Sequence, residues 1–273
     1  MAMIHPSAHV AAGARIADTV EIGPNCTIGG DVTIGPGCHL AAFVNIGGFT
    51  SIGQDTRIGA FASLGTPPQS IAAGDSTGRL VVGAGCNLGG HVTINVGTRD
   101  GGNVTVVGDR CRMLAYSHVA HDCSIGSDVT LGLGVALAGH CQVGDFTQFD
   151  NYSAAHQFSH VGASAMVEMR TFVRSDVIPF GLAAGDLSYL GGFNRLGLRQ
   201  RAFSEADIDI AEEAYRGIFF GADTFASRLN LVAGRYQGHI LADQIIDFIR
   251  ADRRRPLCHP LRQRTSRRVR EMS

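Results

Sequence analysis

Residues 22–46 read IGPNCTIGGDVTIGPGCHLAAFVNI, with an aliphatic residue at every sixth position. The same spacing extends back to Ile4 and forward to Leu64, and it returns over residues 82–94 and 107–173. A strand alternates every two residues and a helix repeats every 3.6, so neither element alone produces this period. Short extended segments that turn at a fixed interval do produce it, and a hexapeptide repeat is typical of a parallel β-helix.

The fifth position of each hexad holds a small residue. We therefore expect the aliphatic and the small side chains to fill the interior of a prism together. A buried free cysteine behaves as a small apolar residue, and the absence of short ligand spacings such as C-x-x-C argues against a metal site. Unpaired cysteines also indicate a reducing compartment. The cysteines at the small position are Cys26, Cys38, Cys86, Cys111, Cys123 and Cys141.

The repeat predicts a β-helix over residues 1–180, interrupted by loops at 65–81 and 95–106. Beyond it the apolar spacing becomes helical, and the Ser-Glu-Ala-Asp sequence that begins at Ser204 is typical of a capped helix start. We expect a small α-helical C-terminal domain over residues 181–273. A domain of this size has little core of its own, so it should pack against the β-helix or a neighbouring subunit.

Arginines cluster at the C-terminal end, in residues 253–273, although the formal net charge of the chain is only −1. Such a tail is most often a solvated, disordered end, and the alternative is a docking site for an acidic partner. No aromatic residues alternate with the arginines, which argues against nucleic-acid binding. The sequence has neither a membrane-spanning apolar run nor a signal-peptide pattern, so we expect a cytoplasmic protein.

Histidines concentrate late in the repeat, outside its interior positions. If three hexads complete one turn, residues eighteen apart stack, which places Gly139 about 4.8 Å from His121. An imidazole can act as a general base near neutral pH, and an unhindered glycine N–H can stabilise an oxyanion. This pair suits acyl transfer onto a hydroxyl or an amine, whereas the alternative is that each histidine is a solvated surface residue. The histidines are His118, His121, His140, His156 and His160.

The segments 115–123, 137–140 and 156–158 resemble the UDP-N-acetylglucosamine O-acyltransferases, the enzymes of the first step of lipid A synthesis. The resemblance extends over nearly the whole chain. It implies a left-handed β-helix, an exception to the usual right-handed crossover, and a homotrimer with active sites between prisms. It also implies transfer of a 3-hydroxyacyl chain from acyl carrier protein to the sugar 3-hydroxyl, with no cofactor and no metal. The acidity of the carrier protein would suit a basic patch.

The same resemblance assigns roles to individual residues. His121 would be the general base, the Gly139 N–H would hold the oxyanion, and Asp122 is a candidate to orient His121, although neighbours on a strand point apart. Asn194 and Arg201 would hold the uridine and phosphate part; the alternatives are that they satisfy turn backbone and serve as a surface charge. The residues that would position the acceptor and the thioester are His118, His140, His156 and Gln157.

Met169 stands where a glycine accompanies long acyl chains in this family, so we predict a preference for about ten carbons or fewer. The alternative is that Met169 packs between subunits. Several acceptor-binding positions of the family are changed, which leaves open a paralogous acyltransferase with another nucleotide-sugar acceptor, and O- or N-acylation. The changed positions are Ser70, Ala72, Asn95, Leu187 and Gln200.

Two other classes of protein also stay open. A γ-type carbonic anhydrase uses histidines on a left-handed β-helix to bind zinc between subunits. The adjacent Gly139 and His140 and the long helical C-terminus argue against it. A non-catalytic scaffold would not need His121.

Overall fold

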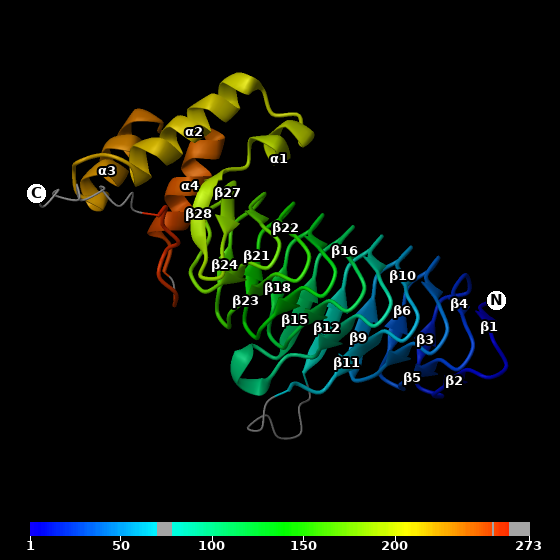
Figure 1. Ribbon diagram of the computed structural model, residues 1–273. Coiled ribbons are helices and arrows are strands. Elements are labelled where there is room, and N and C mark those ends of the chain that lie inside the picture. The colour runs from blue at the N-terminus through cyan, green and yellow to red at the C-terminus, as the bar shows by residue number, and fades with distance from the viewer. Residues whose placement is uncertain (70–77, 253, 262–273) are drawn as a thin grey trace, which may run out of the picture.

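The computed structural model describes residues 1–69, 78–252 and 254–261 of the chain. It is an elongated, three-sided β-helix that carries a small group of helices at its C-terminal end (Figure 1). Each side is a sheet in which the strands of successive coils run parallel, and Thr130 pairs with Arg112, eighteen residues before it. The predicted left-handed coil of three hexads per turn is confirmed.

The three sides are called face A, face B and face C. Face A contains β1 (Met3–Ile4), β4 (Glu21–Ile22), β7 (His39–Leu40), β10 (Arg57–Ile58), β13 (Asn87–Leu88), β16 (Arg112–Met113), β19 (Thr130–Leu131), β22 (Gln148–Phe149), β25 (Met166–Val167), β27 (Gly181–Ala184) and β28 (Tyr189–Phe193). Face B contains β2 (His9–Val10), β5 (Thr27–Ile28), β8 (Asn45–Ile46), β11 (Ser63–Thr66), β14 (Thr93–Asn95), β17 (His118–Val119), β20 (Ala136–Leu137), β23 (Ala154–Ala155) and β26 (Phe172–Val173). Face C contains β3 (Arg15–Ile16), β6 (Thr33–Ile34), β9 (Phe49–Ile52), β12 (Arg79–Val82), β15 (Val104–Val107), β18 (Ser124–Ile125), β21 (Gln142–Val143) and β24 (His160–Val161).

The interior of the prism is built as the hexad predicts. The aliphatic side chains of Ile28, Ile46 and Leu64 are fully buried, and all seven cysteines are free and buried. The Cys26 thiol donates to the carbonyl oxygen of Ala41 at 3.0 Å, so the small position also satisfies corner backbone. The six repeat cysteines are therefore core residues, as we expected, and Cys258, which lies outside the repeat, is buried as well.

The chain turns its corners through left-handed conformations at residues other than glycine. At the corner between faces B and C, Asp122, His140 and Phe158 have φ values of 60°, 61° and 64°. L-residues rarely adopt this region. At these positions the side chains leave the two-sided alternation of the preceding strand. Corner side chains consequently stack on one another from coil to coil.

The two loops are shorter than the sequence predicts. Strand β12 pairs with β15 over four residues, from Arg79 to Val82 and from Val104 to Val107. Face C thus continues into both predicted loop ranges, 65–81 and 95–106. The second loop contains the 3-10 helix η1 (Arg99–Gly101).

The first element after residue 180 is a β-hairpin, because β27 extends face A beside β25 and β28 then pairs with it in the antiparallel sense. Helical structure therefore begins later than the predicted boundary at residue 181, with α1 (Arg195–Gln200). Next come α2 (Glu205–Phe219), capped by Ser204, then α3 (Phe225–Arg235) and α4 (Ile240–Arg250). Among the described residues, no helix is long and apolar enough to cross a bilayer.

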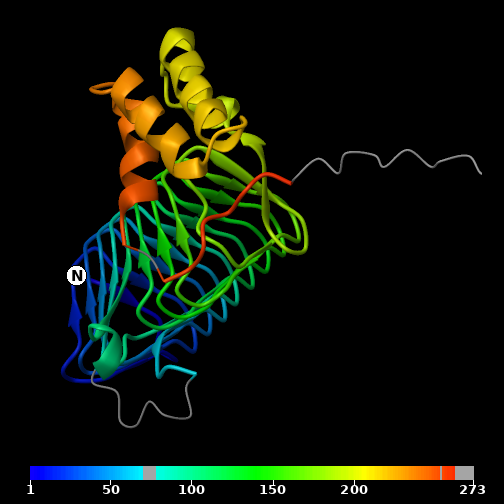
Figure 2. The same ribbon diagram turned by 90° about the vertical axis from the view of Figure 1, so that its left-hand side faces the viewer.

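After α4 the chain returns to the β-helix and lies against its last coils (Figure 2). The backbone N–H of Asp176 donates to Pro256, and the N–H of Cys258 donates to Asp176, both at 2.8 Å. The expectation of a solvated tail is therefore wrong for residues 254–261. Residues 253 and 262–273 lie outside the described part of the chain.

Candidate active site

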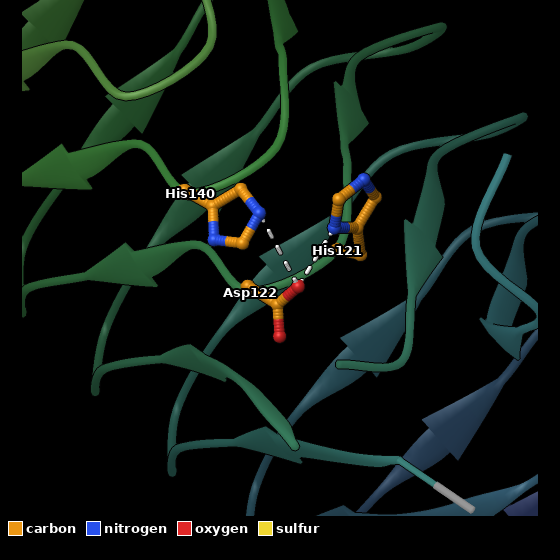
Figure 3. A group of neighbouring side chains, drawn as sticks. All are labelled: His121, Asp122 and His140. Carbon is orange, nitrogen blue, oxygen red and sulfur yellow. Dashed lines mark hydrogen bonds and ion pairs between the residues drawn. The ribbon is translucent and has the colours of Figure 1, made fainter. Parts of the chain in front are cut away.

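His121 and Asp122 form a hydrogen-bonded pair at the corner that follows β17. In a regular strand neighbouring side chains point to opposite sides. The left-handed φ of Asp122 breaks that alternation and turns its carboxylate toward the preceding imidazole. The distance from His121 Nδ1 to Asp122 Oδ2 is 2.7 Å (Figure 3).

The second loop holds the Asp122 carboxylate, whose side chain is fully buried. Thr98 donates its backbone N–H to Oδ1 at 2.8 Å and its hydroxyl to Oδ2 at 2.6 Å, and Asp122 N donates to the Thr105 hydroxyl. A Cβ atom added to Gly101 would collide with this carboxylate, so glycine is needed there. None of these three residues was predicted as a site residue, because they lie where the hexad period is interrupted and so carry no periodic signal.

This arrangement fixes the tautomer of His121. A carboxylate only accepts hydrogen bonds, so Nδ1 carries the proton and the Nε2 lone pair is available as a base. Gly139 stacks beside the ring as predicted: a Cβ atom added to it would lie 2.6 Å from Cε1 and 2.8 Å from Nε2 of His121. Among the described residues, none accepts a hydrogen bond from the Gly139 N–H.

Two further histidines flank the pair. The Nδ1 atom of His118 lies 2.7 Å from the Thr93 hydroxyl, and burial, followed by the nearby His121, lowers the pKa of His118. His140 meets His121 edge to face, with ring centroids 5.1 Å apart. Burial also lowers the pKa of His140, although Asp122 acts in the opposite direction. Both side chains thus favour the neutral imidazole.

His121, Asp122 and His140 each offer one ligand atom within 4.8 Å of the others, and no other such group occurs among the described residues. Two ligands of one tetrahedral zinc lie about 3.3 Å apart, given zinc–nitrogen bonds of about 2.0 Å. The separation of His121 Nδ1 and Asp122 Oδ2, 2.7 Å, is that of a hydrogen bond. The described geometry therefore fits an acid–base pair better than a metal site.

A groove of about 720 Å³ runs along face B beside His121. Its floor is a ladder of alanines, since Ala136 stacks on His118 and Ala154 stacks on Ala136. An apolar floor of this kind suits a hydrocarbon chain. The groove brings together some of the predicted residues with the edge of the first loop; its polar and aromatic lining consists of Gln69, His118, His121, Gln157 and Phe172.

The predicted nucleotide-binding residues lie elsewhere on the chain. Asn194 caps α1, accepting from Gly197 N at 3.0 Å and donating to the Ser164 carbonyl at 2.8 Å. Arg201 lies 4.1 Å from the ring centroid of Phe146, in a hollow of about 380 Å³ on the side of face A. One chain therefore holds the histidines of the groove and Arg201 on different faces.

Met169 also lies outside the groove, at the corner between faces A and B, and its side chain is 55% exposed. Of the family positions that are changed, Asn95 is buried and donates to Thr66 and to the Pro67 carbonyl, so it braces the first loop. Leu187 is exposed at the tip of the β27–β28 hairpin, and Gln200 lines the same hollow as Arg201. Ser70 and Ala72 lie outside the described residues.

His156 is contacted by a residue that the sequence analysis assigned to the tail. The Nη2 atom of Arg255 lies 2.6 Å from His156 Nδ1, and its Nε donates to the Gln157 carbonyl at 2.9 Å. Nothing in the local sequence indicates this contact, because ninety-nine residues separate Arg255 from His156.

Comparison with known proteins finds relatives that match nearly the whole chain. Residues 176–258 match the family model described as UDP N-acetylglucosamine O-acyltransferase, domain 2, and residues 13–48 match the bacterial transferase hexapeptide model. The acyl-[acyl-carrier-protein]--UDP-N-acetylglucosamine O-acyltransferase of Azorhizobium caulinodans is 44% identical over 262 residues, which cover 96% of this chain and 97% of that protein. The protein of the same name from Thiobacillus denitrificans is 41% identical over 254 residues, which cover 93% and 98%.

Solved structures agree as well. The UDP-N-acetylglucosamine acyltransferase of Francisella novicida superposes with a TM-score of 0.91 at 31% identity and covers 94% of each chain. The enzyme of Acinetobacter baumannii gives a TM-score of 0.90 at 30% identity, over 93% of this chain and 99% of that one. Repeat, helical C-terminus and site geometry thus point the same way, and the chain belongs to the UDP-N-acetylglucosamine O-acyltransferase family.

Proposed function

We propose that this protein transfers a 3-hydroxyacyl chain from acyl carrier protein to the 3-hydroxyl of UDP-N-acetylglucosamine, the first step of lipid A biosynthesis. The observation that carries the proposal is the hydrogen-bonded His121–Asp122 pair, with the imidazole packed against Gly139 beside an apolar groove. Relatives that carry this activity in their names match nearly the whole chain. Neither a carbonic anhydrase nor a scaffold accounts for these features together.

His121 acts as the general base in this mechanism. Its Nε2 takes the proton of the acceptor hydroxyl while the hydroxyl oxygen attacks the thioester carbonyl. Asp122 stabilises the imidazolium that forms, and the Gly139 N–H donates to the oxyanion of the tetrahedral intermediate. Collapse breaks the carbon–sulfur bond, and the imidazolium returns its proton to the departing thiolate of the carrier. The balance of the reaction needs neither a metal nor a cofactor.

The remaining residues position the substrates. His118, His140, His156 and Gln157 surround the reacting centre with hydrogen-bonding groups. The alanine ladder receives the acyl chain. The side chain of Met169, at the corner of a neighbouring copy that faces the groove, limits the length of the acyl chain. The buried free cysteines favour a reducing compartment, and we place the enzyme in the cytoplasm.

The active enzyme is a homotrimer in this proposal. The site becomes complete when face B of one copy faces the Arg201 hollow beside face A of the next, and repeated contacts of this type close into a ring. The corner between faces A and B then lies on the axis. Exposed stacked rings along this corner, 4.7 to 5.0 Å apart, support the arrangement because they form an apolar stripe; they are Phe43, Phe61, His91 and Tyr116.

The deciding experiment measures acyl transfer by the purified protein from a 3-hydroxyacyl carrier protein of about ten carbons to UDP-N-acetylglucosamine. We expect turnover that falls by about 10²- to 10⁴-fold in His121→Ala, because a general base contributes this much. His39→Ala, on the exposed surface of face A, should retain full activity. No turnover by the folded wild-type protein would contradict the proposed acceptor and direct the search to other nucleotide sugars.

The role of Met169 is tested with acyl carrier proteins of increasing chain length. Wild type should prefer about ten carbons or fewer, and Met169→Gly should extend the optimum by several carbons, since each accommodated methylene contributes about 0.8 kcal/mol. Met169→Leu keeps the bulk and should leave the optimum unchanged. A wild-type optimum at fourteen carbons would contradict this role.

A further inference from the structure

The segment that follows α4 places an arginine against the histidine at the end of the groove. Arg255 is half-buried, and its guanidinium reaches two neighbouring groups, His156 Nδ1 at 2.6 Å and the Gln157 carbonyl at 2.9 Å. His156 in turn lies against Phe172, with ring centroids 5.9 Å apart, and Phe172 lines the groove. The contact thus connects the C-terminal segment to the acyl-binding face.

The guanidinium decides which nitrogen of His156 carries the proton. Arginine has five N–H donors and no acceptor, so His156 Nδ1 must accept from it. The proton of the neutral imidazole then lies on Nε2, as a donor. The 3.3 Å separation of His156 Nδ1 and Gln157 O is accordingly a contact between two acceptors that share one cation.

The segment is held by backbone hydrogen bonds after this contact and by the side chain of Arg254 before it. Asp176 pairs with Pro256 and Cys258 through two backbone hydrogen bonds of 2.8 Å, and Cys258 is only 1% exposed. Arg254 lies over the ring of Phe158, 4.6 Å from its centroid. A planar fork held in this way loses little rotamer entropy when it binds two acceptors.

We propose that Arg255 is a positioning residue of the acyltransferase. It fixes the tautomer of His156 so that Nε2–H donates a hydrogen bond to an oxygen atom of the bound substrates. This inference rests on the proposed function, because it needs His156 to contact substrate. It assigns a role to the first described part of the arginine-rich tail that is independent of docking the carrier protein.

A double-mutant cycle tests the coupling between Arg255 and His156. Arg255→Ala should lower kcat/KM on the order of tenfold, the effect of losing a charge-assisted hydrogen bond that orients a reacting group. In a His156→Gln background the same substitution should have little effect, because the amide nitrogen of glutamine donates without a tautomer to be set. An equal loss in both backgrounds would overturn the proposal and assign Arg255 a structural or direct binding role.

Two comparison variants sharpen the result. Arg250→Ala removes a neighbouring charge at the end of α4, where the side chain donates a hydrogen bond to Asn230, and should leave kcat/KM unchanged. Arg255→Lys keeps the charge but presents a point-like ammonium that matches two acceptors poorly, so it should not restore activity. Full rescue by lysine would show that charge alone matters and would overturn the positioning role.

The tautomer itself can be observed without any activity. In long-range proton–nitrogen NMR spectra of histidine-labelled protein, assigned with His156→Gln, His156 should show an unprotonated Nδ1 and a protonated Nε2. Arg255→Ala should give a mixture of tautomers. A proton on Nδ1 in the wild type would overturn the proposal. Failure of the proposed acyl transfer would leave this spectrum unchanged, which separates the two ideas.

Discussion

At the scale of the residue, one backbone angle brings Asp122 and His121 together as a hydrogen-bonded pair. Asp122 has a φ of 60°, and this turns its carboxylate to within 2.7 Å of the imidazole that precedes it. Extended backbone at the same position would direct the two side chains to opposite sides. The corner of the β-helix therefore supplies what a separate third segment supplies in many acid–base triads.

Gly139 is the residue at which the smallest change should have the largest effect. In Gly139→Ala the new methyl group would lie 2.6 Å from the His121 ring, so the imidazole must move away from the reacting centre. We expect kcat to fall at least about 10²-fold, because an oxyanion donor and the base are both disturbed. Steady-state kinetics with a thermal melt will measure this.

The control for that change is Gly47→Ala, in the same repeat. A Cβ atom at Gly47 would meet only the Gly65 carbonyl, at 3.8 Å, which is ordinary contact. Its activity should equal that of wild type. If Gly139→Ala also kept full activity, the close approach of His121 would have no catalytic consequence.

His118 should make the folded state sensitive to mild acid. Burial lowers its pKa in the folded state, whereas the unfolded chain keeps the ordinary value of about 6.5. As the pH falls below that value the unfolded chain binds a proton that the folded chain rejects, so stability is lost.

When the pH is lowered from about 7.5 to about 5.5, the melting temperature of His118→Gln should therefore fall less than that of wild type. His9→Gln, at an exposed histidine, is the control and should follow wild type. Equal slopes for wild type and His118→Gln would contradict the assignment of half-buried, neutral His118.

At the scale of the element, the second loop holds the Asp122 carboxylate in place beside His121. Strands β14 and β15 and the 3-10 helix η1 carry Thr98 to the Asp122 carboxylate, which accepts both its N–H and its hydroxyl. A buried carboxylate that keeps its donors remains an effective partner for the imidazole. The loop that interrupts the repeat therefore positions His121 indirectly, through its hydrogen bonds to Asp122.

Thr98→Val removes the hydroxyl donor while preserving the shape of the side chain. We expect kcat to fall on the order of tenfold, because a hydrogen bond to a charged group contributes about 1.5–3 kcal/mol. The matched control is Thr27→Val, on the exposed surface of β5, which should change neither kcat nor stability appreciably. An unchanged kcat in Thr98→Val would mean that the Thr98 N–H alone holds Asp122.

At the scale of the whole molecule, a single prism separates the two halves of the proposed site. His121 and Gly139 line the groove of face B, whereas Arg201 lies in the hollow beside face A. In the proposed homotrimer a neighbouring copy would bring these halves together, so that catalysis would depend on assembly.

Mixed trimers test this coupling. His121→Ala and Arg201→Ala should each be impaired alone, but trimers assembled from equal amounts of both should recover about one quarter of wild-type activity, since about one in four interfaces joins two intact faces. His121→Ala mixed with Gly139→Ala should recover none, because both changes affect face B. If neither mixture recovered activity, a site shared between two copies would be contradicted.

Periodicity in the sequence determined the architecture and the position of Gly139 beside His121. The hexad set the three hexads per turn and the interior place of the repeat cysteines, and the eighteen-residue stacking placed Gly139 beside His121. These features follow from the sequence because they repeat locally, so that each coil contains the information for its neighbours.

Only the tertiary structure decided the contacts between segments that share no period. The turn of Asp122 toward His121, the support from Thr98 and the contact of Arg255 with His156 each depend on a corner angle or on packing across an interruption of the repeat. The separation of Arg201 from the groove likewise depends on where the last coil ends and how the helices cover it. Sequence determines what recurs along the coil, whereas contacts formed once, between distant segments, are fixed only when the chain is folded.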